Sequence, residues 1–185
     1  MKHLMKVAAL ALVAAFSIGS AQAASIDGFL NFSGAVVPVG GSGLADATGL
    51  SFTTDFQVTG SSGTFAANGV GFGTIGEIQD FMFSPLSPAP VSPLLAFFFA
   101  PDTGKFTFDL ETIEVIGQDG SFLSLIGTGT VHGTGLDSTP YDFSLTVDTV
   151  GPIFSYSGTL APVPVPGALI LFMSGLAALG IRRRD

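Results

Sequence analysis

The side chains best suited to catalysis in this sequence are His132 and the serines and carboxylates near it. His132 could act as general base for a serine nucleophile, with Asp137 orienting its ring. However, the sequence contains no Gly-x-Ser-x-Gly nucleophile elbow. His132 also lies in a run of glycine and threonine, Gly127–Gly133, which is typical of a strand. We therefore interpret His132 as a structural histidine and predict no catalytic residue.

Carboxylates form the second group of candidates. Two carboxylates about 5–9.5 Å apart can hydrolyse a glycosidic bond. Alternation along a strand would place Asp109 and Glu111 on one face. Because the solvated face of a sheet also gathers acidic side chains, we interpret them as surface charge. The residues considered for such a pair are Glu77, Asp80, Asp109, Glu111 and Glu114.

Metal and cofactor sites find little support in the sequence. The chain has no cysteine and two histidines, whereas zinc and other transition metals need several such ligands. Calcium is usually held by an acidic loop, but Asp102–Gly104 and Gln118–Gly120 are typical of turns. The segment Gly69–Gly73 fits neither a phosphate-binding loop nor a dinucleotide fingerprint. We predict no metal and no cofactor, with a calcium-binding module kept as an alternative.

The elements that must position these residues are predicted to be β-strands. Residues 24–160 are rich in Gly, Ser, Thr, Phe and Val, and their short apolar segments are separated by glycine. Apolar residues alternate over Phe106–Leu110 and then change phase, which predicts a β-bulge near Glu111 and Thr112. Gln118–Ser121 contains the Asp-Gly signal of a hairpin turn. We predict an all-β fold, an antiparallel β-sandwich or jelly roll, as a single domain over residues 24–160.

Further strands follow from the same alternation. Phe83–Pro93 contains four prolines and is predicted to be a loop or an edge strand. Leu94–Phe99 is apolar on both faces, which predicts a strand buried from both sides. The remaining strand candidates are Phe29–Phe32, Leu50–Phe56, Ile78–Phe83, Phe122–Ile126, Phe143–Val147 and Phe154–Tyr156.

Residues 1–23 have the three parts of a secretory signal peptide. Lys2 and Lys6 form a basic start, and Val7–Ile18 is an almost unbroken apolar run. The small residues Ala21 and Ala23 fit the site that signal peptidase recognises. We predict export and cleavage after Ala23.

Residues 161–185 are predicted to be a second targeting segment. Residues 167–181 carry no charge and, as a helix, would be about 22 Å long against a bilayer core of about 30 Å. The cluster that follows is basic and should stay cytoplasmic, which leaves the body outside. We predict a short transmembrane helix over 167–181, stopped by Arg182, Arg183 and Arg184.

This tail resembles the PEP-CTERM class of sorting signals, and its VPLPA-type variant most closely. The resemblance covers about 25 residues and implies a Gram-negative bacterium in which an exosortase, a membrane transpeptidase-like enzyme, reads the motif at the inner membrane. It further implies that the tail is removed as the protein moves to the cell surface or extracellular matrix, in association with exopolysaccharide and biofilm. The residues that carry the resemblance are the motif Val163, Pro164, Val165, Pro166, Gly167 and Ala168, then the apolar run with Ser174-Gly175-Leu176, then the arginines.

Without these two ends, about 140 residues remain, which is enough for one hydrophobic core. Lys105 and His132 are then the basic side chains against many carboxylates, a balance that excludes nucleic acid as a partner. We predict a non-enzymatic surface or matrix protein that associates with extracellular polysaccharide. The alternatives are a carbohydrate- or calcium-binding adhesin module and a secreted hydrolase.

Overall fold

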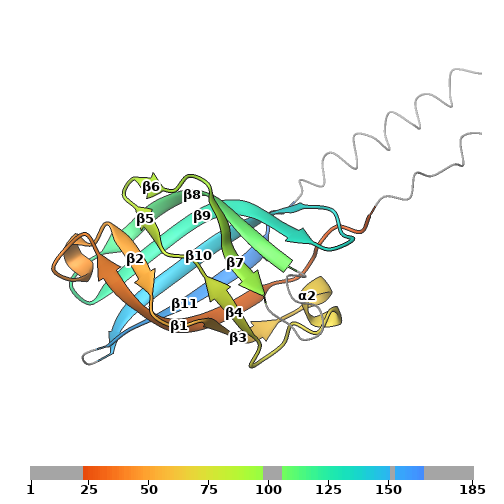
Figure 1. Ribbon diagram of the computed structural model, residues 1–185, viewed down its shortest axis with the longest axis horizontal. Helices are drawn as coiled ribbons and strands as arrows, with labels where there is room; N and C mark the ends of the chain where they lie inside the picture. Colours follow the sequence, from red (N-terminus) through yellow and green to blue (C-terminus); the bar gives the residue numbers. More distant parts are fainter. Residues whose placement is uncertain (1–22, 98–105, 151–152, 165–185) are drawn as a thin grey trace, which may run out of the picture.

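A computed structural model describes residues 23–97, 106–150 and 153–164 (Figure 1). The predicted signal peptide up to residue 22, the motif from Val165 onward, the predicted helix 167–181 and the terminal arginines lie outside the described residues. The elements are β1 (Leu30–Val39), η1 (Leu44–Asp46, a 3-10 helix), β2 (Gly49–Phe52), β3 (Phe56–Ser61), α2 (Gly63–Ala67), β4 (Ile75–Ile78), β5 (Phe81–Phe83), β6 (Leu86–Ser87), β7 (Val91–Phe97), β8 (Phe106–Gln118), β9 (Phe122–Gly133), β10 (Thr139–Val150) and β11 (Ile153–Pro162).

The all-β prediction is confirmed, but the predicted sandwich or jelly roll is replaced by a closed barrel. β1 pairs with β11 over Leu30–Val36 and, along its other edge, with β3 and β2. The hydrogen-bonded order β1-β11-β10-β9-β8-β7-β4-β3 therefore returns to β1, and eight strands close. The sequence could not distinguish the two folds, because inward and outward residues alternate in both. The pairing of the first strand with the last one decides between them.

Three short strands leave this barrel as an extension of the sheet. β2 pairs with the second half of β1, β5 pairs with β2, and β6 pairs with β5. The proline-rich segment Phe83–Pro93 supplies β6 at the edge of the sheet, as predicted from its missing amide donors, but its last three residues begin β7, which pairs with both β4 and β8 and is not an edge strand. Two predicted strands, Leu50–Phe56 and Ile78–Phe83, are each divided between two strands of the structure.

The barrel interior is filled by aromatic rings that lie against glycines of neighbouring strands. A Cβ atom added to Gly129 on β9 would come within 2.6 Å of the Phe108 ring on β8, and one added to Gly158 would collide with Phe32. Phe108 also stacks on Phe143, with ring centroids 5.8 Å apart. Large and small residues thus interlock across the narrow interior, which is how small barrels are filled. This packing gives a structural reason for the many glycines at inward positions.

A short helical element covers each end of the barrel (Figure 1). At one end, α2 buries Phe65 against Phe106 and Tyr141. At the other end, η1 buries Leu44, and its carbonyl accepts a hydrogen bond from Gln118. We call these the α2 end and the η1 end. Among residues 23–97, 106–150 and 153–164, no helix has the length and apolarity that a membrane span requires.

Candidate functional site

A β-bulge in β8 determines which side chains face outward along this part of the barrel. The register with β9 shifts between Leu110 and Thr112, which confirms the bulge predicted there. Before the bulge, Asp109 pairs with Thr130, and after it Thr112 pairs with Thr128 on the same outer face. The extra residue, Glu111, accepts a hydrogen bond of 2.7 Å from the Thr130 hydroxyl. The bulge therefore brings a second set of polar residues to the outer face of β8.

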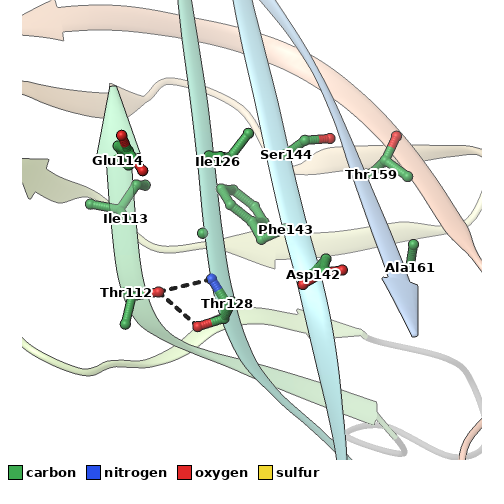
Figure 2. A pocket seen from close by; sticks show the side chains of 11 residues that line it. Thr112, Ile113, Glu114, Ile126, Thr128, Asp142, Phe143, Ser144, Thr159 and Ala161 are labelled. Atoms are coloured by element: carbon green, nitrogen blue, oxygen red, sulfur yellow. Dashed lines mark hydrogen bonds between the residues drawn. The ribbon is translucent and has the colours of Figure 1, made fainter. Parts of the chain in front are cut away.

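Two rows of outward side chains cross β8, β9, β10 and β11 side by side (Figure 2). One row is Thr112, Thr128, Asp142 and Ala161, and the other is Glu114, Ile126, Ser144 and Thr159. Between them runs a row that belongs to the interior, in which Gly127 has no side chain and Phe143 is buried. The two outer rows and this floor line a hollow of about 580 Å³. We call it the outer hollow.

The outer hollow combines bonded hydroxyls with free carboxylates. The Thr112 and Thr128 hydroxyls lie 2.7 Å apart, and the Thr128 amide donates to the Thr112 hydroxyl at 3.1 Å. Within the described part of the chain, the side chains of Glu114, Asp142 and Ser144 form no hydrogen bond or ion pair. These three groups are exposed, so they can bind a ligand without breaking internal contacts.

The electrostatic environment of the outer hollow is acidic. All six Lys and Arg residues of the chain lie outside the described residues. By contrast, every carboxylate residue except Asp102 and Asp185 lies within them. An anionic ligand would therefore meet repulsion and no cationic partner among the described side chains.

His132 joins two other polar residues in the arrangement of a catalytic triad. Its Nδ1 lies 2.8 Å from the Ser138 hydroxyl, and its Nε2 lies 3.3 Å from an Asp109 carboxylate oxygen. Because a carboxylate can only accept, the neutral ring carries its hydrogen on Nε2 and accepts from Ser138 through Nδ1. The sequence hypothesis placed Asp137 beside His132, but the carboxylate that contacts its ring is Asp109.

This triad-like cluster lies on the exposed outer wall. The His132 side chain is 42% exposed, and none of the three residues lines the outer hollow. Acyl transfer also needs donors for the developing oxyanion and a place for the substrate. The amide of Asp137, the residue before Ser138, is not available as such a donor, because it donates to the Ala24 carbonyl.

The other acidic candidates have separate places in the fold. Asp80 accepts from the Ser51 hydroxyl at 2.8 Å and the Phe52 amide at 2.6 Å, which fastens β2. Asp119 accepts from the Ser121 amide in the predicted hairpin turn, and hydrogen bonds to Ser121 and Phe122 lower its pKa. Glu77 lies on β4 at a distance in sequence and strand order from the outer hollow. Among the described residues, no group of three or more His, Asp or Glu side chains is placed to hold a metal ion.

Sequence reasoning identified Glu114 but missed the rest of the outer hollow. Thr128, Asp142 and Ser144 occupy alternate positions of strands, where polar residues are ordinary on any solvated face. Their alignment depends on the registers of four strands and on the bulge, so no local signal could have found them. Comparisons with protein-family models, curated proteins and solved structures found no match to this chain.

Proposed function

We propose that this chain is an exported, non-enzymatic protein of the cell surface or extracellular matrix whose barrel associates with extracellular polysaccharide. In this proposal, the chain is held for a time in the inner membrane by residues 167–181. An exosortase-type enzyme then acts at the motif Val163–Ala168 and releases the barrel. The sorting step rests on the sequence of the tail, and the binding step rests on the outer hollow.

The observation that carries the binding step is the pair of polar rows in the outer hollow. Sugars present hydroxyl groups that both donate and accept, and the unpaired carboxylates of Glu114 and Asp142 are strong acceptors for them. Ile126 and Ala161 add apolar area for the C–H faces of a ring. The volume of about 580 Å³ is within the range of sites that hold small ligands. A segment of a polysaccharide chain fits this chemistry.

The charge of the barrel restricts the polysaccharide to a neutral one. Uronic acid or sulfate groups would approach a surface whose described residues include carboxylates and no Lys or Arg. Like charges in contact destabilise a complex, and the effect weakens with salt. We therefore expect binding to neutral glycans and rejection of acidic ones at low ionic strength.

A glycan array tests the binding step, with Asp142→Asn compared with Asp148→Asn. Both residues lie on β10 with exposed side chains, but only Asp142 lines the outer hollow. Removing a charged acceptor from a ligand contact should weaken binding by about tenfold or more. We expect this loss for Asp142→Asn and little change for Asp148→Asn. Equal losses in both variants, or no neutral glycan bound, would contradict the proposal.

The same array, repeated with calcium and with chelator, tests the adhesin alternative. Calcium-dependent lectins lose their ligand when calcium is removed, whereas hydrogen bonds from the outer hollow do not need the ion. We expect the same glycans and signals in both conditions. Binding that disappears with the chelator would favour a calcium-binding adhesin module instead.

Mass spectrometry of released protein tests the sorting step. If the tail is a processed signal, the surface fraction should contain chains that end near Pro164–Gly167. Peptides that contain Arg182 in that fraction would contradict removal of the tail.

A secreted hydrolase is the second candidate, and the contacts of His132 with Ser138 and Asp109 are the observation in its favour. If these contacts are structural, His132→Ala will not change the hydrolysis of ester or glycoside substrates by the purified protein. Covalent labelling of Ser138 by a fluorophosphonate probe, lost in His132→Ala, would establish the hydrolase.

A further inference from the structure

The turn between β9 and β10, together with the first residues of β10, holds both ends of the described chain. The Asp137 amide donates to the Ala24 carbonyl at 3.0 Å, and the Ile26 amide donates to the Thr139 hydroxyl at 3.0 Å. At the start of β10, the Pro140 carbonyl accepts from the Val163 amide at 3.3 Å. The first and last described residues therefore leave the barrel together, at the α2 end (Figure 1).

The distance from the barrel to the predicted membrane helix is short. Only residues 165 and 166 separate Pro164 from Gly167, so even a fully extended chain covers about 11 Å. A helix over 167–181 that lies in a bilayer must therefore hold the α2 end close to the lipid surface. The η1 end lies farther away, since β8 alone runs 13 residues between the two ends, about 40 Å of strand.

Exposed aromatic side chains lie at the α2 end. Phe72 is 83% exposed and stands between Gly71 and Gly73, and Phe29 is 41% exposed. The loop that carries Phe72 is attached to this end, because the Val70 amide donates to the Phe65 carbonyl of α2 at 3.0 Å. The same loop is also connected to the strand that follows Phe29. The Ser61 hydroxyl donates to the Val70 carbonyl of the loop, and Ser61 pairs with Leu30, the residue after Phe29.

We propose that, while the tail is in the membrane, the α2 end rests on the lipid surface and Phe72 inserts into it. This inference rests on the proposed membrane-tethered stage. Phenylalanine is among the apolar side chains that surface-bound elements bury in lipid, and this burial contributes favourably in proportion to the apolar area of the ring. Phe29 and Val163 enlarge the same contact, since both are partly exposed at this end.

Among the described residues of this end, apolar burial supports the contact and attraction between opposite charges does not. The described residues include no Lys or Arg, and Asp27 at this end is engaged by the Thr64 amide at 2.8 Å. The described residues of this end offer an anionic lipid surface no cation, so the surface that we propose is a zwitterionic one. Phosphatidylcholine vesicles are therefore the appropriate probe.

Tryptophan fluorescence can test this inference because the chain contains no tryptophan. Three single variants of the full-length chain, Phe72→Trp, Phe122→Trp and Phe172→Trp, are reconstituted into phosphatidylcholine vesicles with and without acyl-chain bromination. Phe122 is the matched control, since it is an exposed phenylalanine at the η1 end of the barrel. Phe172 lies in the predicted membrane helix and reports insertion of the tail.

We expect bromolipid to quench the emission of Phe172→Trp strongly and that of Phe72→Trp clearly, and to leave the emission of Phe122→Trp unchanged. On reconstitution, the emission of Phe72→Trp should also shift to shorter wavelength, and that of Phe122→Trp should not. If Phe172→Trp is quenched while Phe72→Trp behaves like Phe122→Trp, the barrel does not rest on the lipid through this end, and the inference fails while the anchor stands. An unquenched Phe172→Trp variant would overturn the anchor itself, and the orientation with it.

Discussion

The two ends of the barrel are closed by different chemistry. At the α2 end, Phe65 enters the barrel and packs against Phe106 and Tyr141, with ring centroids 5.1 and 5.9 Å apart. At the η1 end, one side chain fastens the cover, because the Gln118 amide donates to the Leu44 carbonyl at 2.6 Å and to the Ala47 carbonyl at 2.8 Å. Aromatic packing fills the α2 end, whereas at the η1 end the hydrogen bonds of one side chain hold a cover that buries Leu44.

This difference corresponds to the positions of the chain ends. The α2 end also holds Ala24 and Val163, through Asp137 in the turn before β10 and Pro140 at the start of β10, so a pull on either end of the described chain reaches the barrel there. Dense aromatic packing resists such strain, because its many contacts are lost only together. The η1 end holds neither end of the described chain, and its cover is held by the two hydrogen bonds of Gln118 and the burial of Leu44. Four substitutions, measured on residues 24–164, test whether the two ends differ in this way.

Phe65→Ala should have the largest effect. Phe65 is fully buried, and truncating such a ring removes its apolar burial and leaves a cavity, at a cost of about 3–5 kcal/mol. Urea unfolding followed by circular dichroism gives the free energy directly. Phe72→Ala is the matched control in the same region, and its exposed ring predicts a change within about 0.5 kcal/mol. Similar losses of unfolding free energy in the two variants would show that the buried Phe65 ring of α2 does not close this end.

Gln118→Met should rank second. The methionine keeps the length of the side chain but leaves the carbonyls of Leu44 and Ala47 without their donor, at a cost of about 1–3 kcal/mol. Gln57→Met is the control, because Gln57 is exposed on β3. Hydrogen exchange should show faster opening of η1 in the Gln118 variant, with the α2 end unchanged. A loss no larger than that of the control would mean that η1 closes this end by burial of Leu44 alone.

The sequence predicted the strands better than it predicted the closure of the barrel, the contacts at its ends or the outer hollow. Alternation identified β8 and β10, and the phase change at Glu111 identified the bulge. By contrast, the pairing of β1 with β11 joins Leu30 to Leu160, and Gln118 reaches residues more than seventy positions away. The outer hollow likewise depends on four registers at once. Local patterns specify local backbone, whereas closure and the site arise from long-range contacts that one sequence does not display.

Tyr141→Phe should have a smaller effect than Phe65→Ala or Gln118→Met. The Tyr141 hydroxyl donates to the Gly28 carbonyl at 2.9 Å and ties β10 to the segment before β1. A net hydrogen bond of this kind contributes about 1 kcal/mol. Burial raises the pKa of Tyr141, with the Asp27 carboxylate adding to the shift. A tyrosine whose pKa is raised on folding stabilises the fold below its ordinary pKa, so the difference between the two proteins should shrink as pH rises beyond about 10. No change at neutral pH would show that this hydrogen bond is dispensable.

Tyr156→Phe should have the smallest effect, although this tyrosine is equally buried. Its ring contacts Phe52 and Phe32 further toward the η1 end, and Gly34 leaves room for its hydroxyl. Among the described residues, that hydroxyl has no hydrogen-bond partner, so its burial carries a desolvation cost with no compensating bond. Removing it should leave the unfolding free energy unchanged within about 0.5 kcal/mol, or raise it slightly. A loss equal to that of Tyr141→Phe would mean that the hydroxyl is bonded in solution, most simply through an internal water, and that the interior toward the η1 end is more polar than its side chains indicate.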